Sequence, residues 1–301
     1  MKVATANAGL PRVSDGAPLE LAAAVARLGA LPGVSVSRLG DVDGKPIEVV
    51  RVASTAPPGQ AIKVLITGGV HGNEGVGPAA AVALAELVAK DPALRGKIEL
   101  TVVPCVNPEG YADHTRRNEN DDADLNREFI EDGSVPREVR EVQPVLDAGP
   151  YALAVDLHAS QAQDSQGNAG FFAIQSGGDL AALQAAMRRF AASFPVLGET
   201  TEKYTKVENG IFTSRNQGTL KEYLYSRGTP RAYTIEAPQH LPYARQVEGM
   251  IALVSDLMGE VAAHPGGAPT VDAFQPGGAQ PRPAPAQAPV LPTVEHQKLW
   301  S

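Results

Sequence analysis

Cysteine is nearly absent from this chain, because Cys105 is the only one among 301 residues. A single cysteine cannot form an internal disulfide, so the chain is not a disulfide-stabilised scaffold and fits a reducing compartment. Cys105 lies in an apolar run, residues 98–106, with no activating histidine in a matching motif. We therefore expect a buried, unreactive thiol rather than a cysteine nucleophile.

Long hydrophobic runs are also absent. No stretch of about 18 apolar residues occurs, so we expect no transmembrane helix. The beginning of the chain lacks the continuous apolar core of a signal peptide, because it is interrupted by Asn7, Pro11, Arg12, Asp15 and Glu20. These absences predict a cytoplasmic protein.

The chain has no excess of positive charge. Its formal net charge is -8 and its pI is about 5.3, and no block of lysine and arginine occurs. Such a charge balance argues against binding to nucleic acid or to an anionic membrane surface. A small, soluble substrate is therefore the expected ligand, and the sequence identifies no protein partner.

The apolar residues form strand-like and helix-like segments that alternate along the chain. Segments with strand character are 34–38, 47–53, 63–67, 98–105, 152–157, 170–174 and 232–235. Segments with helical spacing are 79–89, directly after Pro78, 180–190 and 246–261. This alternation predicts an α/β fold, in which helices cover both faces of a mixed sheet.

The length and composition allow one or two domains. With 43% hydrophobic residues, the chain can bury a substantial core. From residue 264 it becomes rich in proline and glycine, which favours a flexible segment. We expect an N-terminal segment over residues 1–33, one catalytic domain over residues 34–263, and a flexible C-terminal tail over residues 264–301.

Metal-binding side chains stand at the ends of apolar runs. His71-Gly-Asn-Glu74 follows residues 63–70, and His158 follows a second run. Two histidines and a glutamate are a ligand set typical of zinc in hydrolases, with one coordination position left for water. His71, Glu74 and His158 are therefore the predicted ligands. Glu236, which ends a third run, would then be free to act as a general base.

Two segments between these motifs supply positive charge. Arg116 could stabilise an oxyanion that develops during hydrolysis. Asn126 and Arg127 could hold a substrate carboxylate, because a planar guanidinium binds carboxylate through two parallel hydrogen bonds. The residue types therefore predict both a hydrolytic centre and an anion-binding position.

Each of these residues alone has a simpler explanation. An HxxE pair occurs by chance in many proteins, His158 could be a hydrogen-bonded core histidine, and Glu236 could be a buried ion-pair partner. Asn126 and Arg127 could lie on a solvated turn. Their occurrence together, in this order, favours one site over four independent coincidences.

Together, the motifs resemble those of the zinc carboxypeptidase family, the carboxypeptidase A-like metallopeptidases, and in particular its compact bacterial members. The resemblance spans about residues 40 to 260 and is carried by His71-Gly-Asn-Glu74, Asn107-Pro-Glu-Gly-Tyr111, Arg116, Asp124-Leu-Asn-Arg-Glu-Phe129, Asp156-Leu-His158 and Thr234-Ile-Glu236. It implies a mixed, mostly parallel, twisted eight-stranded sheet with helices on both faces. It also implies a zinc-dependent metallocarboxypeptidase, with one zinc ion per chain, that hydrolyses the C-terminal amide bond of a peptide, such as a small or cell-wall-derived one.

The resemblance assigns the metal and catalytic roles position by position. His71, Glu74 and His158 would bind zinc. Glu236 would be the general base that activates the attacking water, and Arg116 would polarise the scissile carbonyl.

Further roles follow around the metal. Asn126 and Arg127 would hold the terminal carboxylate of the substrate, and Asp124 would support the first zinc histidine through a hydrogen bond. Where the digestive enzymes carry a mobile tyrosine, this chain has Ser214. Lys221 falls near the expected floor of the substrate pocket, where it would favour a carboxylate-bearing side chain such as glutamate or diaminopimelate. Its simpler explanation is a lysine on a solvated turn.

Two other functions compete with the peptidase. A zinc-dependent N-acyl amino acid amidohydrolase, similar to succinylglutamate desuccinylase or aspartoacylase, shares the HGNE, DLNR and DLH elements and would act on a small acyl-amino-acid substrate. The Asn107-Pro-Glu-Gly-Tyr111 segment is closer to the peptidase form. A binding protein without catalysis would be expected to have lost a ligand or the base, and all of these residues are present.

Overall fold

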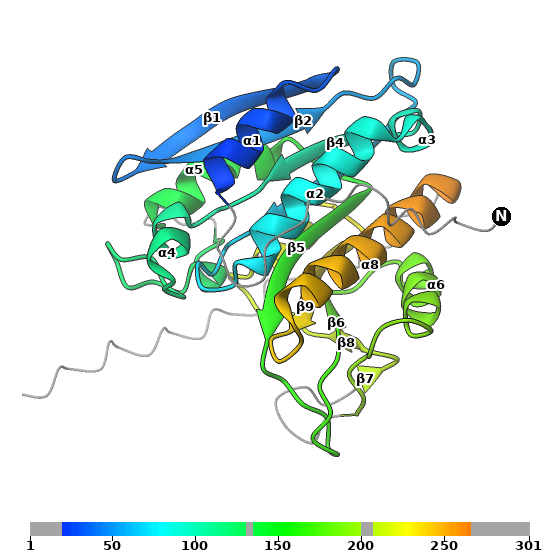
Figure 1. The fold of residues 1–301 in the computed structure, drawn as a ribbon. Coiled ribbons are helices and arrows are strands. Elements are labelled where there is room, and N and C mark those ends of the chain that lie inside the picture. Colours follow the sequence, from blue (N-terminus) through cyan, green and yellow to red (C-terminus); the bar gives the residue numbers. More distant parts are fainter. Residues whose placement is uncertain (1–19, 131–134, 200–206, 266–301) are drawn as a thin grey trace, which may run out of the picture. The chain divides into compact units, whose positions relative to one another are not determined.

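The computed structural model describes residues 20–130, 135–199 and 207–265, which form one mixed β-sheet with helices on both faces (Figure 1). The strands are β1 (Val34–Val42), β2 (Lys45–Val52), β3 (Ile62–Gly68), β4 (Ile98–Val103), β5 (Leu153–Ser160), β6 (Phe172–Gln175), β7 (Val207–Glu208), β8 (Ile211–Thr213) and β9 (Ala232–Pro238). The helices are α1 (Leu21–Gly29), α2 (Val76–Lys90), α3 (Pro92–Arg95), α4 (Pro108–Asp113), the 3₁₀ helix η1 (Leu125–Arg127), α5 (Arg137–Asp147), α6 (Ala181–Phe190), α7 (Leu220–Ser226) and α8 (Tyr243–Ala263).

The strands of the sheet follow the order β1-β2-β4-β3-β5-β9-β6-β8-β7. Its centre, from β4 through β3 and β5 to β9, is parallel. A parallel neighbour needs a crossover connection, and the long helix α2 supplies the one from β3 to β4. The three central strands β3, β5 and β9 therefore all end at the same edge of the sheet.

The fold class predicted from the sequence is confirmed, with two corrections of detail. Eight strands have three or more residues, and β7 adds a two-residue ninth strand at one edge. The description "mostly parallel" holds only for the centre, because among the described strands four pairs are parallel and four are antiparallel. Short hairpin connections such as that between β1 and β2 allow antiparallel pairing, so the strands toward both edges add antiparallel pairs.

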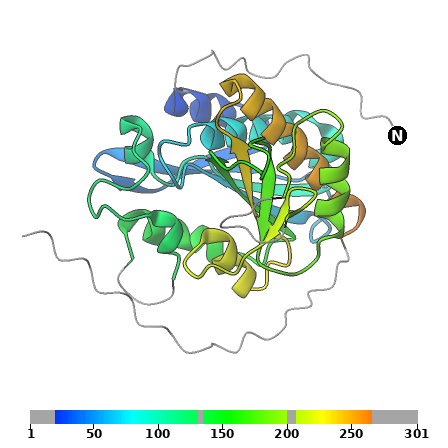
Figure 2. The ribbon, with the colours of Figure 1, turned by 90° about the horizontal axis from the view of Figure 1, so that it is seen from below.

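Both faces of the sheet are covered, as Figure 2 shows from below. Val64 and Ile66 of β3 pack in the cluster that contains α1, α2, α6 and α8, whereas Leu65 packs in the cluster that contains α5 and α7. Successive side chains of a strand point to opposite faces, so a strand covered on both sides must be apolar throughout. This requirement explains the continuous apolar run at residues 64–66.

Helix α1 belongs to the same folded unit as the sheet. Its residues Ala24, Val25 and Leu28 are buried in the hydrophobic cluster that also contains residues of α2 and α8. Part of the segment 1–33 therefore packs against the predicted catalytic domain. The described residues lie within the compact unit 1–271, whereas the predicted tail from residue 266 onward lies outside the described residues.

Two smaller predictions can be compared with the structure. Cys105 is buried and unpaired, and burial raises the pKa of its thiol, as expected for an unreactive side chain. Within the described ranges, no helix combines the length and apolar character that crossing a membrane requires.

Candidate active site

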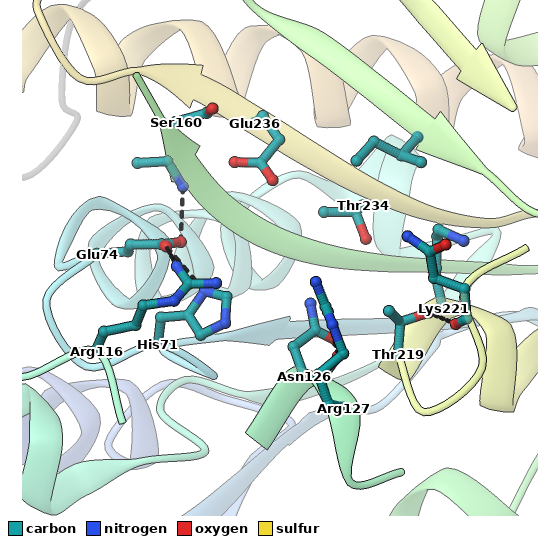
Figure 3. A pocket seen from close by; sticks show the side chains of 13 residues that line it. His71, Glu74, Arg116, Asn126, Arg127, Ser160, Thr219, Lys221, Thr234 and Glu236 are labelled. Atoms are coloured by element: carbon teal, nitrogen blue, oxygen red, sulfur yellow. Dashed lines mark hydrogen bonds and ion pairs between the residues drawn. The ribbon is translucent and has the colours of Figure 1, made fainter. Parts of the chain in front are cut away.

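The three central strands bring the predicted site residues to one edge of the sheet. His158 of β5 pairs in register with Glu236 of β9, and His71 and Glu74 follow the carboxyl end of β3. Carboxyl ends of neighbouring parallel strands meet at one edge, which is where ligands bind in open α/β sheets. Residues separated by 165 positions therefore face one cavity (Figure 3).

The tight loop from His71 to Glu74 requires a glycine at position 72. A Cβ atom on Gly72 would lie 2.0 Å from the carbonyl carbon of Gly110 and 2.3 Å from the backbone nitrogen of Tyr111. The N–H of Glu74 donates to the carbonyl oxygen of His71 at 3.2 Å, which closes the turn. Only glycine fits between two backbones this close, and the resulting turn points both side chains into the site.

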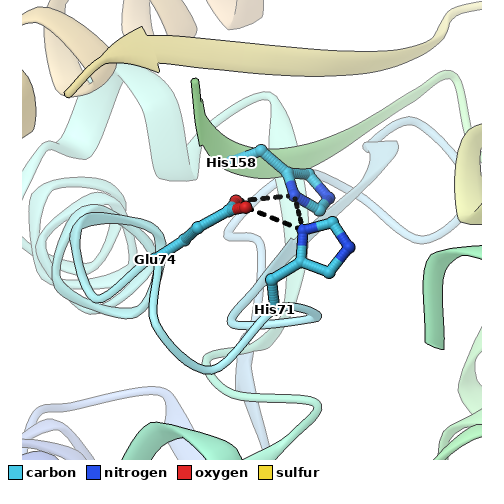
Figure 4. A group of neighbouring side chains, drawn as sticks. All are labelled: His71, Glu74 and His158. Carbon is cyan, nitrogen blue, oxygen red and sulfur yellow. Dashed lines mark hydrogen bonds and ion pairs between the residues drawn. The ribbon is translucent and has the colours of Figure 1, made fainter. Parts of the chain in front are cut away.

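His71, Glu74 and His158, the ligands predicted from the sequence, lie close enough together to hold a metal ion, and we call them the metal-binding group. All three side chains are buried, and one ligand atom from each lies within 4.8 Å of the others. The Nδ1 atoms of the two histidines are 3.0 Å apart, and the two carboxylate oxygens of Glu74 lie 2.8 Å from one Nδ1 each (Figure 4). A tetrahedral zinc ion with bonds of about 2.0–2.1 Å places its donors about 3.3 Å apart, so a modest expansion would admit it.

Each histidine turns its other nitrogen to an aspartate. Nε2 of His71 lies 3.0 Å from Oδ1 of Asp124, and Nε2 of His158 lies 2.7 Å from Oδ2 of Asp156. A carboxylate accepts a hydrogen bond from Nε2–H, which leaves the lone pair of Nδ1 for a metal. The donor set and its orientation thus fit zinc.

The charges at this group indicate a cation site. Burial raises the pKa of Glu74, but His158 and His71 outweigh that effect and hold it well below its usual value. Burial lowers the pKa of His158, but the carboxylates of Asp156 and Glu74 outweigh it and raise it well above 6.5. A buried cluster that retains this much negative charge needs a proton or a metal ion to neutralise it.

Glu236 lies beside the metal-binding group without taking part in it. Its carboxylate lines the cavity and makes no hydrogen bond or ion pair with any described residue. Burial raises its pKa to about 7, an effect that His158 reduces and Glu74 reinforces. A carboxylate with a pKa near neutrality can both accept and release a proton, as a general base must.

The predicted cationic residues lie around the same cavity. Arg116 donates to Oε1 of Glu74 at 3.0 Å and to Oδ2 of Asp124 at 3.3 Å, with its side chain 45% exposed. Asn126 is oriented by the backbone N–H of Leu220, which donates to its Oδ1 at 2.9 Å. The Arg127 guanidinium donates to the carbonyl oxygen of Asn126 at 2.6 Å.

The cavity itself has a volume of about 230 Å³. Seven of the nine predicted site residues line it, and Asp124 and His158 are the two that do not. Figure 3 places Glu236 across the cavity from Asn126 and Arg127. One cavity is therefore lined by His71 and Glu74 of the metal-binding group, by the Glu236 carboxylate and by two guanidinium groups.

Comparison with protein families decides the identity of this arrangement. The family model of zinc carboxypeptidases matches residues 34–249, which is more than two thirds of the chain. The chain belongs to the zinc carboxypeptidase family. It is accordingly a metallocarboxypeptidase, a hydrolase that acts on peptide bonds.

Solved structures share the fold of this carboxypeptidase. A candidate metallopeptidase from Shewanella denitrificans is 19% identical, with a TM-score of 0.67 and coverage of 80% of this chain and 89% of that one. A metallo-carboxypeptidase from Burkholderia cenocepacia is 20% identical, with a TM-score of 0.63 and coverage of 80% and 68%. One from Pseudomonas aeruginosa, in complex with (2-guanidinoethylmercapto)succinic acid, is 22% identical, with a TM-score of 0.61 and coverage of 80% and 67%. No curated protein matches by sequence.

Lys221 of this carboxypeptidase lies on helix α7, not on the solvated turn that was its simpler explanation. It is only 2% exposed and lines the cavity. Its Nζ donates to Oγ of Ser176 at 2.9 Å and to the carbonyl oxygen of Ser214 at 2.5 Å. Burial lowers its pKa to about 8, and no carboxylate of the described residues lies within ion-pair distance of it.

A second cavity, of about 340 Å³, adjoins the first in this carboxypeptidase. The two share Glu74 and Ala159, and the second is further lined by Tyr111, Tyr243 and Gln239. Its lining contains aromatic rings and amides, with Glu74 as its carboxylate. Glu74 of the metal-binding group therefore lies where two cavities with different linings meet.

Several residues that line the cavity of the carboxypeptidase were given no site role from the sequence. The cavity is also lined by Ser160, Ile174, Asn216, Thr219 and Thr234. The sequence contains a signal for Thr219, because Thr219 and Glu222 have the spacing of a capping box. In the structure, the Thr219 hydroxyl accepts a hydrogen bond from the backbone N–H of Glu222. That pattern would have predicted helix α7.

Proposed function

We propose that this carboxypeptidase removes the last residue of peptides with a free C-terminus, using zinc held by His71, Glu74 and His158. The observation that carries this proposal is the unpaired Glu236 carboxylate, which faces the cavity beside three buried ligands. A base that has no partner among the described residues, next to a metal-binding group that borders a cavity, is the arrangement that hydrolysis needs.

The base would act on a water molecule in the cavity. Zinc, when bound, would supply a Lewis acid that acidifies water and polarises a carbonyl. Glu236 would accept the proton of the attacking water and later release it to the leaving amine nitrogen. Burial raises its pKa to about 7 in the metal-free protein, which supports a carboxyl group that exchanges a proton near neutral pH.

The positively charged side chains of the cavity would bind different groups of the substrate. Arg116, which is close to Glu74 and half-exposed, can reach the scissile carbonyl oxygen and stabilise its developing negative charge. Asn126 and Arg127, across the cavity from Glu236, would hold the terminal carboxylate. A peptide amide at the C-terminus would lack that contact.

Lys221 would select the side chain that is released. Its ammonium group is buried, lines the cavity and has no carboxylate partner among the described residues. Burying an unpaired charge is unfavourable, so a substrate carboxylate would compensate for it. We therefore infer a preference for a C-terminal residue that carries a side-chain carboxylate, such as glutamate or diaminopimelate.

The second cavity would accommodate the part of the peptide before the scissile bond. It meets the first cavity at Glu74 and Ala159, whereas Lys221 and Arg127 line only the first cavity. An N-acyl amino acid amidohydrolase is not better supported, since the family model that matches is that of the zinc carboxypeptidases.

Metal content and hydrolysis, measured together, test the proposal. We expect about one zinc ion per chain, turnover of peptides with a free C-terminus, and no turnover of the same peptides with an amidated C-terminus. Glu236→Gln should keep the zinc and lose at least a thousandfold in kcat, an order of magnitude typical for a group that acts in the transition state. Zinc without peptide cleavage, but with cleavage of an N-acyl amino acid, would indicate the amidohydrolase instead.

A set of peptides that differ only in the last residue tests the role of Lys221. Glutamate, glutamine and leucine ends should be compared in the wild type and in Lys221→Met, which keeps the length of the side chain and removes its charge. A charge-assisted hydrogen bond contributes about 1.5–3 kcal/mol, so the glutamate-to-glutamine ratio of kcat/KM should fall about tenfold to a hundredfold. An unchanged ratio would exclude Lys221 as the determinant.

The remaining predictions extend beyond the site. We propose residues 34–263 as the catalytic domain, with α1 packed against it and residues 264–301 as a tail. A cytoplasmic location stays a prediction from the sequence.

A further inference from the structure

The two aspartates behind the histidines differ in their surroundings. Asp124 is reached by solvent and shares its carboxylate among His71, the Arg116 guanidinium and the backbone N–H of Asn126. Asp156 is 1% exposed, and its only ion-pair partner among the described residues is His158, at 2.7 Å. The Asp124 carboxylate thus interacts with three groups, whereas among the described residues the Asp156 carboxylate pairs with one histidine only.

Thr67 holds the buried aspartate in place. It pairs in register with Asp156 across the parallel strands β3 and β5, and it is itself 1% exposed. Its hydroxyl donates to Oδ1 of Asp156 at 2.7 Å, which leaves Oδ2 directed at Nε2 of His158. Asp156 and His158 are two positions apart on one strand, so their side chains point to the same face of the sheet.

We propose that Asp156, fixed by Thr67, is a positioning residue that holds His158 in the one ring orientation and tautomer that offers Nδ1 to zinc. This inference rests on the proposed zinc-dependent function only in its choice of metal. Because Asp156 accepts the proton of Nε2–H, the lone pair of Nδ1 remains directed at the centre shared with His71 and Glu74. An amide in place of this carboxylate could instead donate to Nε2, which would move the ring proton to Nδ1 and block the ligand position.

Zinc affinity of the full-length protein tests this role without any use of activity. Each purified variant is stripped of metal, checked for folding by circular dichroism, and titrated with zinc against a chromophoric chelator. Loss of a carboxylate that supports a metal histidine weakens metal binding by about 10- to 100-fold, which is the effect expected for Asp156→Asn. Thr67→Val, which removes the hydroxyl and keeps the shape, should weaken binding on the order of fivefold, because the carboxylate loses its orientation.

Thr67→Ser is the matched control, since it retains the hydroxyl and should bind zinc within about twofold of the wild type. If Asp156→Asn fails to fold, the comparison of Thr67→Val with Thr67→Ser still decides the question. The absorption spectrum of the cobalt-substituted protein gives a second readout, which should change in Thr67→Val and be restored in Thr67→Ser.

Equal zinc affinity in the wild type, Asp156→Asn and Thr67→Val would overturn the inference and leave the proposed function standing. A wild-type protein that binds no zinc would overturn both. Steady-state kinetics distinguishes positioning of the metal ligand from binding of the peptide. If Thr67 acts through the metal ligand, Thr67→Val should lower kcat and leave KM for the peptide unchanged.

Discussion

Nδ1 of His71 lies 3.0 Å from Nδ1 of His158, in the interior of the site. Two imidazole nitrogens at this distance repel each other unless a proton or a metal ion lies between their lone pairs. Both rings also contact the Glu74 carboxylate. The metal-free protein must therefore retain protons at this group, and a metal would replace them.

Zinc binding should release protons at neutral pH. Because the pKa of His158 is raised well above 6.5 by Asp156 and Glu74, the ring is protonated in the metal-free protein at pH 7. Calorimetric titration in buffers of different ionisation enthalpy measures this release. His240→Ala, which removes an exposed histidine outside the site, should behave like the wild type, whereas His158→Ala should bind zinc poorly. Binding without any net proton release would contradict the charge state inferred for this group.

Metal removal should also lower thermal stability. A ligand that binds only the folded state at a thousand times its Kd stabilises it by about 4 kcal/mol, which corresponds to roughly 10 °C in Tm for a domain of this size. Differential scanning calorimetry with zinc and with a chelator measures the difference. His158→Ala should show no such difference, because one of the three ligands is missing.

Glu236→Gln should change how the stability of the metal-free protein depends on pH. Burial raises the folded-state pKa of Glu236 from 4.5 to about 7, so the folded state holds its proton more tightly than the unfolded state does. The contribution of Glu236 to the free energy of unfolding is therefore greatest below pH 4.5 and is lost as the pH rises to about 7. Urea denaturation of both proteins between pH 4.5 and 7.5 should show the variant gaining stability relative to the wild type as the pH rises. Parallel curves would mean that Glu236 ionises normally.

Lys221→Met should change the pH dependence of stability in the opposite direction, and at alkaline pH. Burial lowers the folded-state pKa of Lys221 from 10.5 to about 8, so the unfolded state binds its proton more tightly. The wild type should therefore gain stability relative to the variant between pH 8 and 10.5, by up to about 3 kcal/mol. Chemical denaturation at pH 7.5 and at pH 10 measures this change. Lys97→Met, at an exposed position, should show no such gain.

Gly72→Ala should disable the metal site through the backbone. Its Cβ would lie 2.0 Å from the carbonyl carbon of Gly110, and no flexible side chain can move aside to make room. We expect destabilisation of about 3 kcal/mol or more, with loss of zinc binding, because the His71–Glu74 turn would have to open. Gly259→Ala is the matched control. That exposed glycine of helix α8 has no atom within 4 Å of the added Cβ, so the change should stabilise by about 0.5–1 kcal/mol.

The grouping of His71, Glu74 and His158 at one edge of the sheet could be predicted from the sequence, because these residues follow strands with a clear apolar character. The runs before His71, His158 and Glu236 are buried on both faces, and such runs end where the chain leaves the sheet. Parallel pairing then brings those ends together. The roles of individual site residues remain predictions until they are measured.

Other features could not be predicted from the sequence, because they depend on tertiary contacts or on elements too short to give a recognisable pattern. The role of Asp156 depends on Thr67 lying opposite it, and that register belongs to the folded sheet. Strand β8 has only three residues, too few for an alternating pattern to be recognised. Helix α5 contains Pro144, and an internal proline is unfavourable in a helix, although Val139, Val142 and Val145 have helical spacing.

The pairing of His158 with Glu236 places the proposed zinc ligand and the proposed base on adjacent strands. If β9 slipped by one residue against β5, Glu236 would turn to the other face of the sheet, while all three zinc ligands would stay where they are. Zinc content therefore reports on β3 and β5, and turnover reports in addition on β9. In a preparation of this enzyme, the ratio of turnover to bound zinc would measure how completely the last strand has docked in its native alignment.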